Sequence, residues 1–144
     1  MNNMISTRHG LFVVLIVGSV FSFGVSPVAA DEVIAITDIK RKDPVSFENE
    51  ILPILRRNCL ACHNATDAES DLVMETPATM LTGGLDGPAI VAGKGSDSLI
   101  IKLASRAQES FMPPDDNDVG AKSLTPKELG LLNFGLIRVQ KAKS

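Results

Sequence analysis

The sequence contains no tryptophan and no tyrosine, and it has only six phenylalanines, two cysteines and two histidines in 144 residues. With so few aromatic side chains, a single small domain would build a thin hydrophobic core, which a bound cofactor could fill. The net charge is −3, and no basic cluster marks a nucleic-acid-binding face. The length suffices for one domain and not for two.

The first 30 residues have the three-part layout of a secretory signal. Residues 1–10 are polar and carry Arg8, residues 11–20 are almost wholly apolar, and residues 26–30 offer small side chains for a peptidase. A membrane anchor is the alternative, but the apolar run is shorter than the roughly 20 residues that a spanning helix needs. We therefore predict cleavage after Ala30 and export to the periplasm or an equivalent compartment, with no later membrane span.

Cleavage would remove His9, so that His63 becomes the only histidine of the processed chain. It would also remove Arg8, one of 14 basic residues, and none of the 17 acidic residues. The processed protein is therefore expected to be more acidic than the full chain.

The region after the signal divides into a linker, residues 31–45, and one domain, residues 46–144. The charged stretch Lys40–Asp43 is interpreted as part of a solvated linker. A helix is predicted over Ser46–Arg57, with Ser46 as its N-cap. Pro53 would bend this helix or make it effectively start later.

Three further helices are predicted from their start signals. One follows Thr76-Pro77 and ends at Gly83-Gly84, and another is capped by Ser96 or Asp97. The last begins at Thr125-Pro126 with a capping box to Glu128. The result is an all-α domain of roughly four short helices. The long loops rich in glycine and proline, including the irregular stretch 111–119, are expected to serve a ligand.

The string Cys59-Leu60-Ala61-Cys62-His63 is the attachment signature of a c-type haem. Each thiol would add across a vinyl group to give a thioether, and His63 would bind the iron as the proximal ligand. We therefore predict one covalent haem c on Cys59 and Cys62.

The two cysteines have three other possible roles. A structural disulfide is compatible with an oxidising compartment. A thioredoxin-like redox pair belongs on a βαβ framework, which the sequence does not indicate. Zinc needs four ligands, and the processed chain supplies only three cysteine or histidine groups.

The sixth iron ligand is inferred by elimination. Ligation by two histidines of this chain is excluded after cleavage, and methionine is the usual alternative. Met74 and Met80 are interpreted as core residues. Met112 lies in Phe111-Met112-Pro113-Pro114, where two prolines stiffen the loop, so we predict it as the distal ligand. With both axial positions filled, the iron would transfer single electrons.

These strings resemble the planctomycete-type cytochrome c domain, a mono-haem relative of class I cytochromes c. The resemblance implies a small helical domain with long loops around one covalent haem, Met112 as distal ligand, and residues 87–93 along the side of the haem. It rests on Phe47, Ile51–Leu55, Cys59–His63, Gly83-Gly84, Gly87–Val91, Gly93, Ser98-Leu99, Met112–Pro114, Leu124-Thr125 and Glu128-Leu129.

The C-terminus departs from the family pattern, which closes with Trp-Ile and then Gly-Ala. The stretch from Phe134 to Lys141 contains no tryptophan, and Gly135 weakens a helix. One choice of codons for this stretch would read, in another frame, as Trp-Ile-Asp-Gln-Gly-Ala-Lys. The alternatives are ordinary divergence and a frameshift or truncation after about residue 133 in the gene of a longer protein. Sequencing that gene distinguishes them.

The sequence thus predicts an exported electron carrier with redox donor and acceptor proteins as partners, and no enzymatic activity of its own. The alternative is a haem-bearing binding or scaffold module that is a fragment of a larger protein. A thiol oxidoreductase that uses Cys59 and Cys62 without haem is a third hypothesis.

Overall fold

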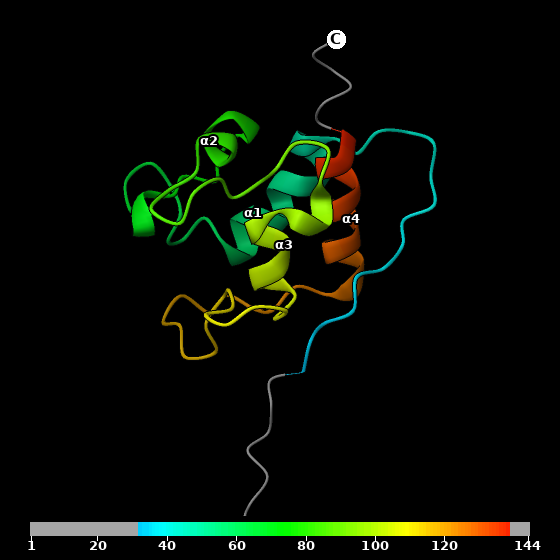
Figure 1. Cartoon of the computed structure of the whole chain (residues 1–144). Coiled ribbons are helices and arrows are strands. Elements are labelled where there is room, and N and C mark those ends of the chain that lie inside the picture. Colours follow the sequence, from blue (N-terminus) through cyan, green and yellow to red (C-terminus); the bar gives the residue numbers. More distant parts are fainter. Residues whose placement is uncertain (1–31, 139–144) are drawn as a thin grey trace, which may run out of the picture.

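The computed structural model describes residues 32–138, and this part of the chain is helical (Figure 1). The predicted signal peptide lies outside the described residues. Within them there is no strand, only two isolated bridges, His63 with Ala68 and Gly84 with Gly87. The predicted all-α class is therefore confirmed. The elements are η1 (Phe47–Ile51), α1 (Leu52–Asn58), η2 (Glu69–Asp71), α2 (Pro77–Thr82), η3 (Gly95–Asp97), α3 (Leu99–Ala104) and α4 (Pro126–Arg138).

Figure 1 shows α1, α3 and α4 gathered together, while α2 is set apart at the end of long loops. The shared core consists of apolar side chains from these helices and from the loops between them. Leu55 of α1, Ile101 of α3, and Leu129 and Leu132 of α4 are at most 1% exposed. Burial of such side chains is the main stabilising contribution in a domain of this size.

The first helical segment begins at the predicted residue as a π-helical turn and continues as an α-helix. Ser46 is its N-cap, and the Ser46 hydroxyl accepts a hydrogen bond from the Asn49 amide at 3.2 Å. The segment starts as a π-helical turn, and the regular helix α1 begins at Leu52, with Pro53 in its first turn. A proline is tolerated there because the first helical amides have no partner within the helix. The prediction of a later helix start is confirmed.

Helix α4 has the predicted start. The Thr125 amide and hydroxyl donate to a carboxylate oxygen of Glu128 at 2.9 and 2.8 Å. The apolar face formed by Leu129, Leu132 and Leu136 is buried. The helix continues through Gly135 to Arg138, so the glycine does not end it.

Helix α2 starts at the predicted residue, whereas helix α3 does not. Thr76 caps α2 through a reciprocal pair of bonds with Thr79, and Gly83 ends the helix at φ +77°, as predicted. The predicted cap of α3, Ser96 or Asp97, is wrong, because both residues belong to the 3₁₀ turn η3 and the N-cap is Ser98.

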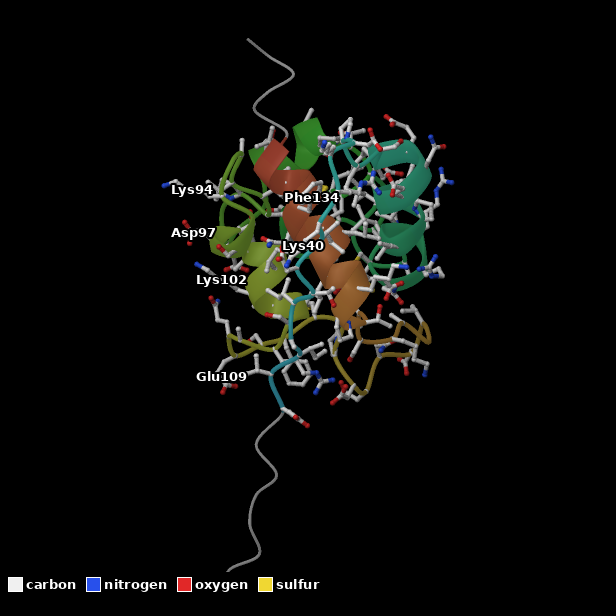
Figure 2. All side chains as sticks on the ribbon, turned by 90° about the vertical axis from the view of Figure 1, so that its right-hand side faces the viewer. Lys40, Lys94, Asp97, Lys102, Glu109 and Phe134 are labelled. Atoms are coloured by element: carbon white, nitrogen blue, oxygen red, sulfur yellow. The ribbon has the colours of Figure 1, made fainter. Side chains whose placement is uncertain are left out.

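The segment before residue 46 contacts the domain, while Lys40, Lys42 and Asp43 of the predicted solvated stretch are exposed. The Ile34 amide donates to the Ser105 carbonyl at 2.8 Å, and the Thr37 amide donates to the Pro126 carbonyl at 3.0 Å. Arg41 forms an ion pair with Glu50 at 2.6 Å. In Figure 2 the segment that carries Lys40 crosses the face of α4. No helix among residues 32–138 is long and apolar enough to cross a membrane.

Candidate haem site

A cavity of about 470 Å³ opens between α1, α3 and the loops that flank them. Its lining includes Cys59, Cys62, His63 and Met112, the four residues that sequence reasoning selected. Its apolar wall is formed by Leu72, Leu99, Ile100, Leu103, Ala104 and Leu124. The volume lies in the range typical of small-molecule and cofactor sites, which are mostly apolar with a few convergent polar groups.

The two cysteines and His63 lie on a tight turn that follows directly from α1. Cys59 is the C-cap residue of this helix, and its amide donates to the Leu55 carbonyl at 2.7 Å. The amides of Cys62 and His63 both donate to the Cys59 carbonyl, at 3.2 and 3.0 Å. Because the helix end fixes Cys59 and the turn fixes the other two residues relative to it, the backbone presents all three side chains to one cavity.

His63 is held in one orientation by a backbone carbonyl. Its Nδ1 lies 3.2 Å from the carbonyl oxygen of Glu69. A carbonyl can only accept a hydrogen bond, so Nδ1 is the donor, and the tautomer of the imidazole that fits this bond has its lone pair on Nε2. Such a bond to the second ring nitrogen is the common arrangement of a histidine that ligates a metal.

The two thiols are free rather than joined in a disulfide. Burial, and to a lesser extent the neighbouring Cys62, raises the pKa of the Cys59 thiol to about 12. Burial also raises the pKa of Cys62, with a further contribution from Glu69 and Asp67. Redox-active and nucleophilic cysteines have lowered pKa values, so these thiols differ from those of a thiol oxidoreductase.

Met112 differs from the other methionines among the described residues. Met74 and Met80 are 4% and 1% exposed and belong to the core. Met112 is 39% exposed and lines the cavity. Met74 also lines the cavity, whereas Met80 does not. A free thioether at the wall of the cavity is what a sixth iron ligand requires.

The loop that carries Met112 is fastened at both ends to the rest of the domain. The Met112 amide donates to the Leu103 carbonyl of α3 at 3.2 Å. Arg106 pairs with Asp115, donates to the Ser123 hydroxyl at 3.1 Å, and lies over the ring of Phe111.

Asn117 closes the second half of this loop. Its amide nitrogen donates to the carbonyls of Pro114 and Ala121 at 2.6 and 3.0 Å, and its oxygen accepts from the Ala121 amide at 2.9 Å. Sequence reasoning missed both Arg106 and Asn117. An asparagine among aspartates and a glycine signals a turn, but nothing local marks Arg106.

The residues around the cavity fit a covalent haem. Two free thiols stand beside an imidazole whose Nδ1 donates to a backbone carbonyl, a thioether lines the same space, and the wall is apolar. The segment expected along the side of the haem contributes Gly87 and Ala89 to the lining. The donor set therefore matches thioether attachment with axial ligation by nitrogen and sulfur.

A Cys-x-x-Cys-His turn at an apolar cavity is the attachment site of the c-type cytochromes as a class. Residues 59–116 match the model of one family in that class, planctomycete cytochrome C. The matched segment begins at Cys59 and includes Met112, and it confirms the predicted resemblance to the planctomycete-type cytochrome c domain over these residues. The chain matches no curated protein and no solved structure.

Proposed function

We propose that the protein is a mono-haem c-type cytochrome that transfers single electrons outside the cytoplasm. The observation that carries the proposal is that one cavity is lined by Cys59, Cys62, His63 and Met112. In the proposed domain division, residues 1–30 are a cleaved signal, residues 31–45 lead into the domain, and residues 46–144 are the cytochrome c-like domain with its loops around one haem.

Each part of the site has a defined task in this function. Cys59 and Cys62 hold the cofactor by thioether bonds, and the Glu69 carbonyl keeps the His63 ring oriented with Nε2 available for the iron. Met112 would supply the second protein ligand to the iron, which would leave no position open to oxygen or substrate. The apolar wall around Leu99 and Leu103 keeps water from the ring. A bound haem supplies one-electron chemistry between ferrous and ferric iron, and thioether ligation favours the ferrous state.

The pKa values disfavour a thiol oxidoreductase, because a thiol with a pKa of about 12 forms almost no thiolate at neutral pH. A haem-bearing scaffold module shares the same site and differs only in whether the iron exchanges electrons.

The test is to export the protein in a host with haem-attachment machinery and to record a pyridine haemochrome spectrum. One covalent haem per chain is expected, together with a reversible one-electron potential. Colourless protein, or protein with both thiols free, contradicts the haem assignment. Covalent haem without a reversible potential supports the scaffold module instead.

The distal ligand is tested by Met112→Ala with Met74→Leu as its matched control. Both methionines line the cavity, but Met74 is 4% exposed and belongs to the core. The first variant should lose the sulfur-to-iron charge-transfer band and shift to a lower potential, and the second should keep the band. The opposite pattern would make Met74 the ligand.

A further inference from the structure

The charged side chains that line the cavity are of one sign. Four carboxylates border it, from Glu69, Asp86, Asp116 and Asp118, and no lysine or arginine of the described residues does so. His63 is the one basic side chain in the lining, and its Nδ1 is bonded to a backbone carbonyl. Lys122 follows Ala121 of the lining but is not part of it. The rim of the cavity is therefore strongly negative at neutral pH.

These four carboxylates are exposed, and among residues 32–138 none of them forms an ion pair. Neighbouring Asp115 differs, because it is paired with Arg106. Unpaired carboxylates that line one cavity sum to a field that extends about a Debye length, roughly 8–10 Å at physiological salt. A charged molecule that approaches the cavity from solvent would therefore experience this negative field.

Large apolar side chains are exposed on the same rim. Leu85 is 75% exposed and lies between Gly84 and Asp86 of the lining, while Val119 is 52% exposed and is itself part of the lining. The Leu85 amide donates to the carbonyl of Ser70, the residue that follows Glu69, at 2.8 Å. Exposed leucine and valine side chains favour contact with another protein surface over contact with a small ion.

We propose that this rim, defined by Glu69, Leu85, Asp86, Asp116, Asp118 and Val119, is the docking surface for a redox protein with a basic patch around an apolar centre. The proposal rests on the proposed function and adds the kind of partner. Complementary charge would accelerate the encounter and fix its orientation, and Leu85 and Val119 would be covered in the complex. In each encounter one centre loses a single electron and the other gains it, with no other group exchanged.

Charge also selects against other occupants of the surface. An anionic lipid surface or a nucleic acid carries the same sign as the rim and would be repelled. An acidic redox protein would be repelled for the same reason. A partner rich in lysine or arginine is therefore the class that the rim favours.

Isothermal titration calorimetry of the ferric holoprotein measures this docking without any electron transfer. The probes are a lysine-rich mitochondrial cytochrome c and an acidic plastocyanin, both oxidised. The basic probe should bind at low ionic strength with a Kd that rises steeply with salt, and the acidic probe should not bind. Failure to bind the basic probe, or binding that is independent of salt, overturns the proposal.

Two variants of equal charge locate the surface. Neutralising the rim with Glu69→Gln, Asp86→Asn, Asp116→Asn and Asp118→Asn should weaken binding of the basic probe by about tenfold or more. The control neutralises four exposed carboxylates that do not line the cavity, namely Glu32, Glu48, Asp97 and Glu109. Figure 2 labels Asp97 and Glu109 among the outward-pointing side chains. If the two variants weaken binding of the basic probe equally, the binding surface is not confined to the rim and the proposal is contradicted.

The apolar part of the rim has its own test. Leu85→Asn should weaken binding of the basic probe at all salt concentrations, because it removes apolar contact and no charge. Unchanged binding would show that Leu85 is not covered in the complex. A holoprotein without a reversible potential that still binds the basic probe would contradict the electron-transfer function and leave the docking surface intact.

Discussion

The guanidinium carbon of Arg106 lies 4.0 Å from the centre of the Phe111 ring, immediately before Met112 in the chain. The same guanidinium pairs with Asp115 and bonds to Ser123, so one side chain spans both ends of the loop that carries Met112. Arg106 is in this sense a positioning residue for the proposed distal ligand.

Replacement of Arg106 by alanine should free the Met112 loop. We expect the unfolding free energy to fall by about 1–2 kcal/mol, and the sulfur-to-iron band to disappear at a lower alkaline pH than in the parent protein. Arg106→Lys should restore the band only in part, because lysine keeps the charge without the planar fork.

The control for this loop is Arg57→Ala, which removes the surface ion pair with Glu128 and leaves the Met112 loop untouched. It should not move the alkaline transition of the band. An equal shift in both variants would mean that the band reports general stability rather than the loop.

Two glycines in α4 should respond oppositely to alanine. A Cβ on Gly130 would collide with the carbonyl oxygen of Thr37, whereas a Cβ on Gly135 would meet Val45 at 3.5 Å, an ordinary contact distance. Gly130→Ala should destabilise the protein by about 1–3 kcal/mol through overpacking. Gly135→Ala should stabilise it by up to about 1 kcal/mol. Urea denaturation of the holoproteins measures both, and a harmless Gly130→Ala would mean that the segment before residue 46 is not docked on α4.

The ion pair between Arg41 and Glu50 should make stability depend on acid pH. The hydrogen bond from Arg41, followed by that from the Ser46 amide, lowers the pKa of Glu50 from 4.5 to about 2. The native state therefore holds the carboxylate charged where the unfolded state binds a proton. This contribution is present above pH 4.5 and is lost as the pH falls towards 2.

Thermal unfolding between pH 6 and pH 2 tests this contribution. Glu50→Gln should lower the Tm at pH 6, and the difference from the parent protein should vanish near pH 2. Glu48→Gln, which changes an exposed neighbour on the same turn, should leave the pH dependence as it is. A constant difference for Glu50→Gln across the range would show that the carboxylate charge is not responsible.

Asn117 should decide how well the loop after Met112 is ordered. Asn117→Ala removes three hydrogen bonds to Pro114 and Ala121, at an expected cost of about 1–3 kcal/mol, and should speed proteolysis between residues 114 and 121. Asn117→Asp keeps the acceptor for the Ala121 amide but places carboxylate oxygens against two carbonyls, so it should not rescue the loop. Limited proteolysis of the two variants and the parent protein provides the comparison.

Helix starts that depend on adjacent residues were predictable. The Thr125–Glu128 and Thr76–Thr79 boxes form within one turn of the chain, so their chemistry is local. The start of α3 was not predictable. The Ser98 hydroxyl accepts from the Val91 amide and donates to the Lys94 carbonyl, so bonds to the preceding loop take the side chain that would otherwise cap the helix.

The docking of the segment before residue 46 also depends on contacts between residues far apart in the sequence. A charged stretch with little apolar content predicts solvent exposure, and only the close approach of α4 at Gly130 gives residues 37–39 a surface to pack on. Likewise, the pairing of Arg41 with Glu50 depends on the chain doubling back onto the first helical turn.

The sequence by itself determined the attachment motif, because Cys59, Cys62 and His63 lie within five residues and one turn fixes their relation. Only the tertiary structure brought Met112 and the acidic rim to the same cavity as this motif. Contacts of this kind close long loops, and their entropy cost is met only when the whole core assembles. Nothing in the neighbouring residues of the chain encodes that assembly.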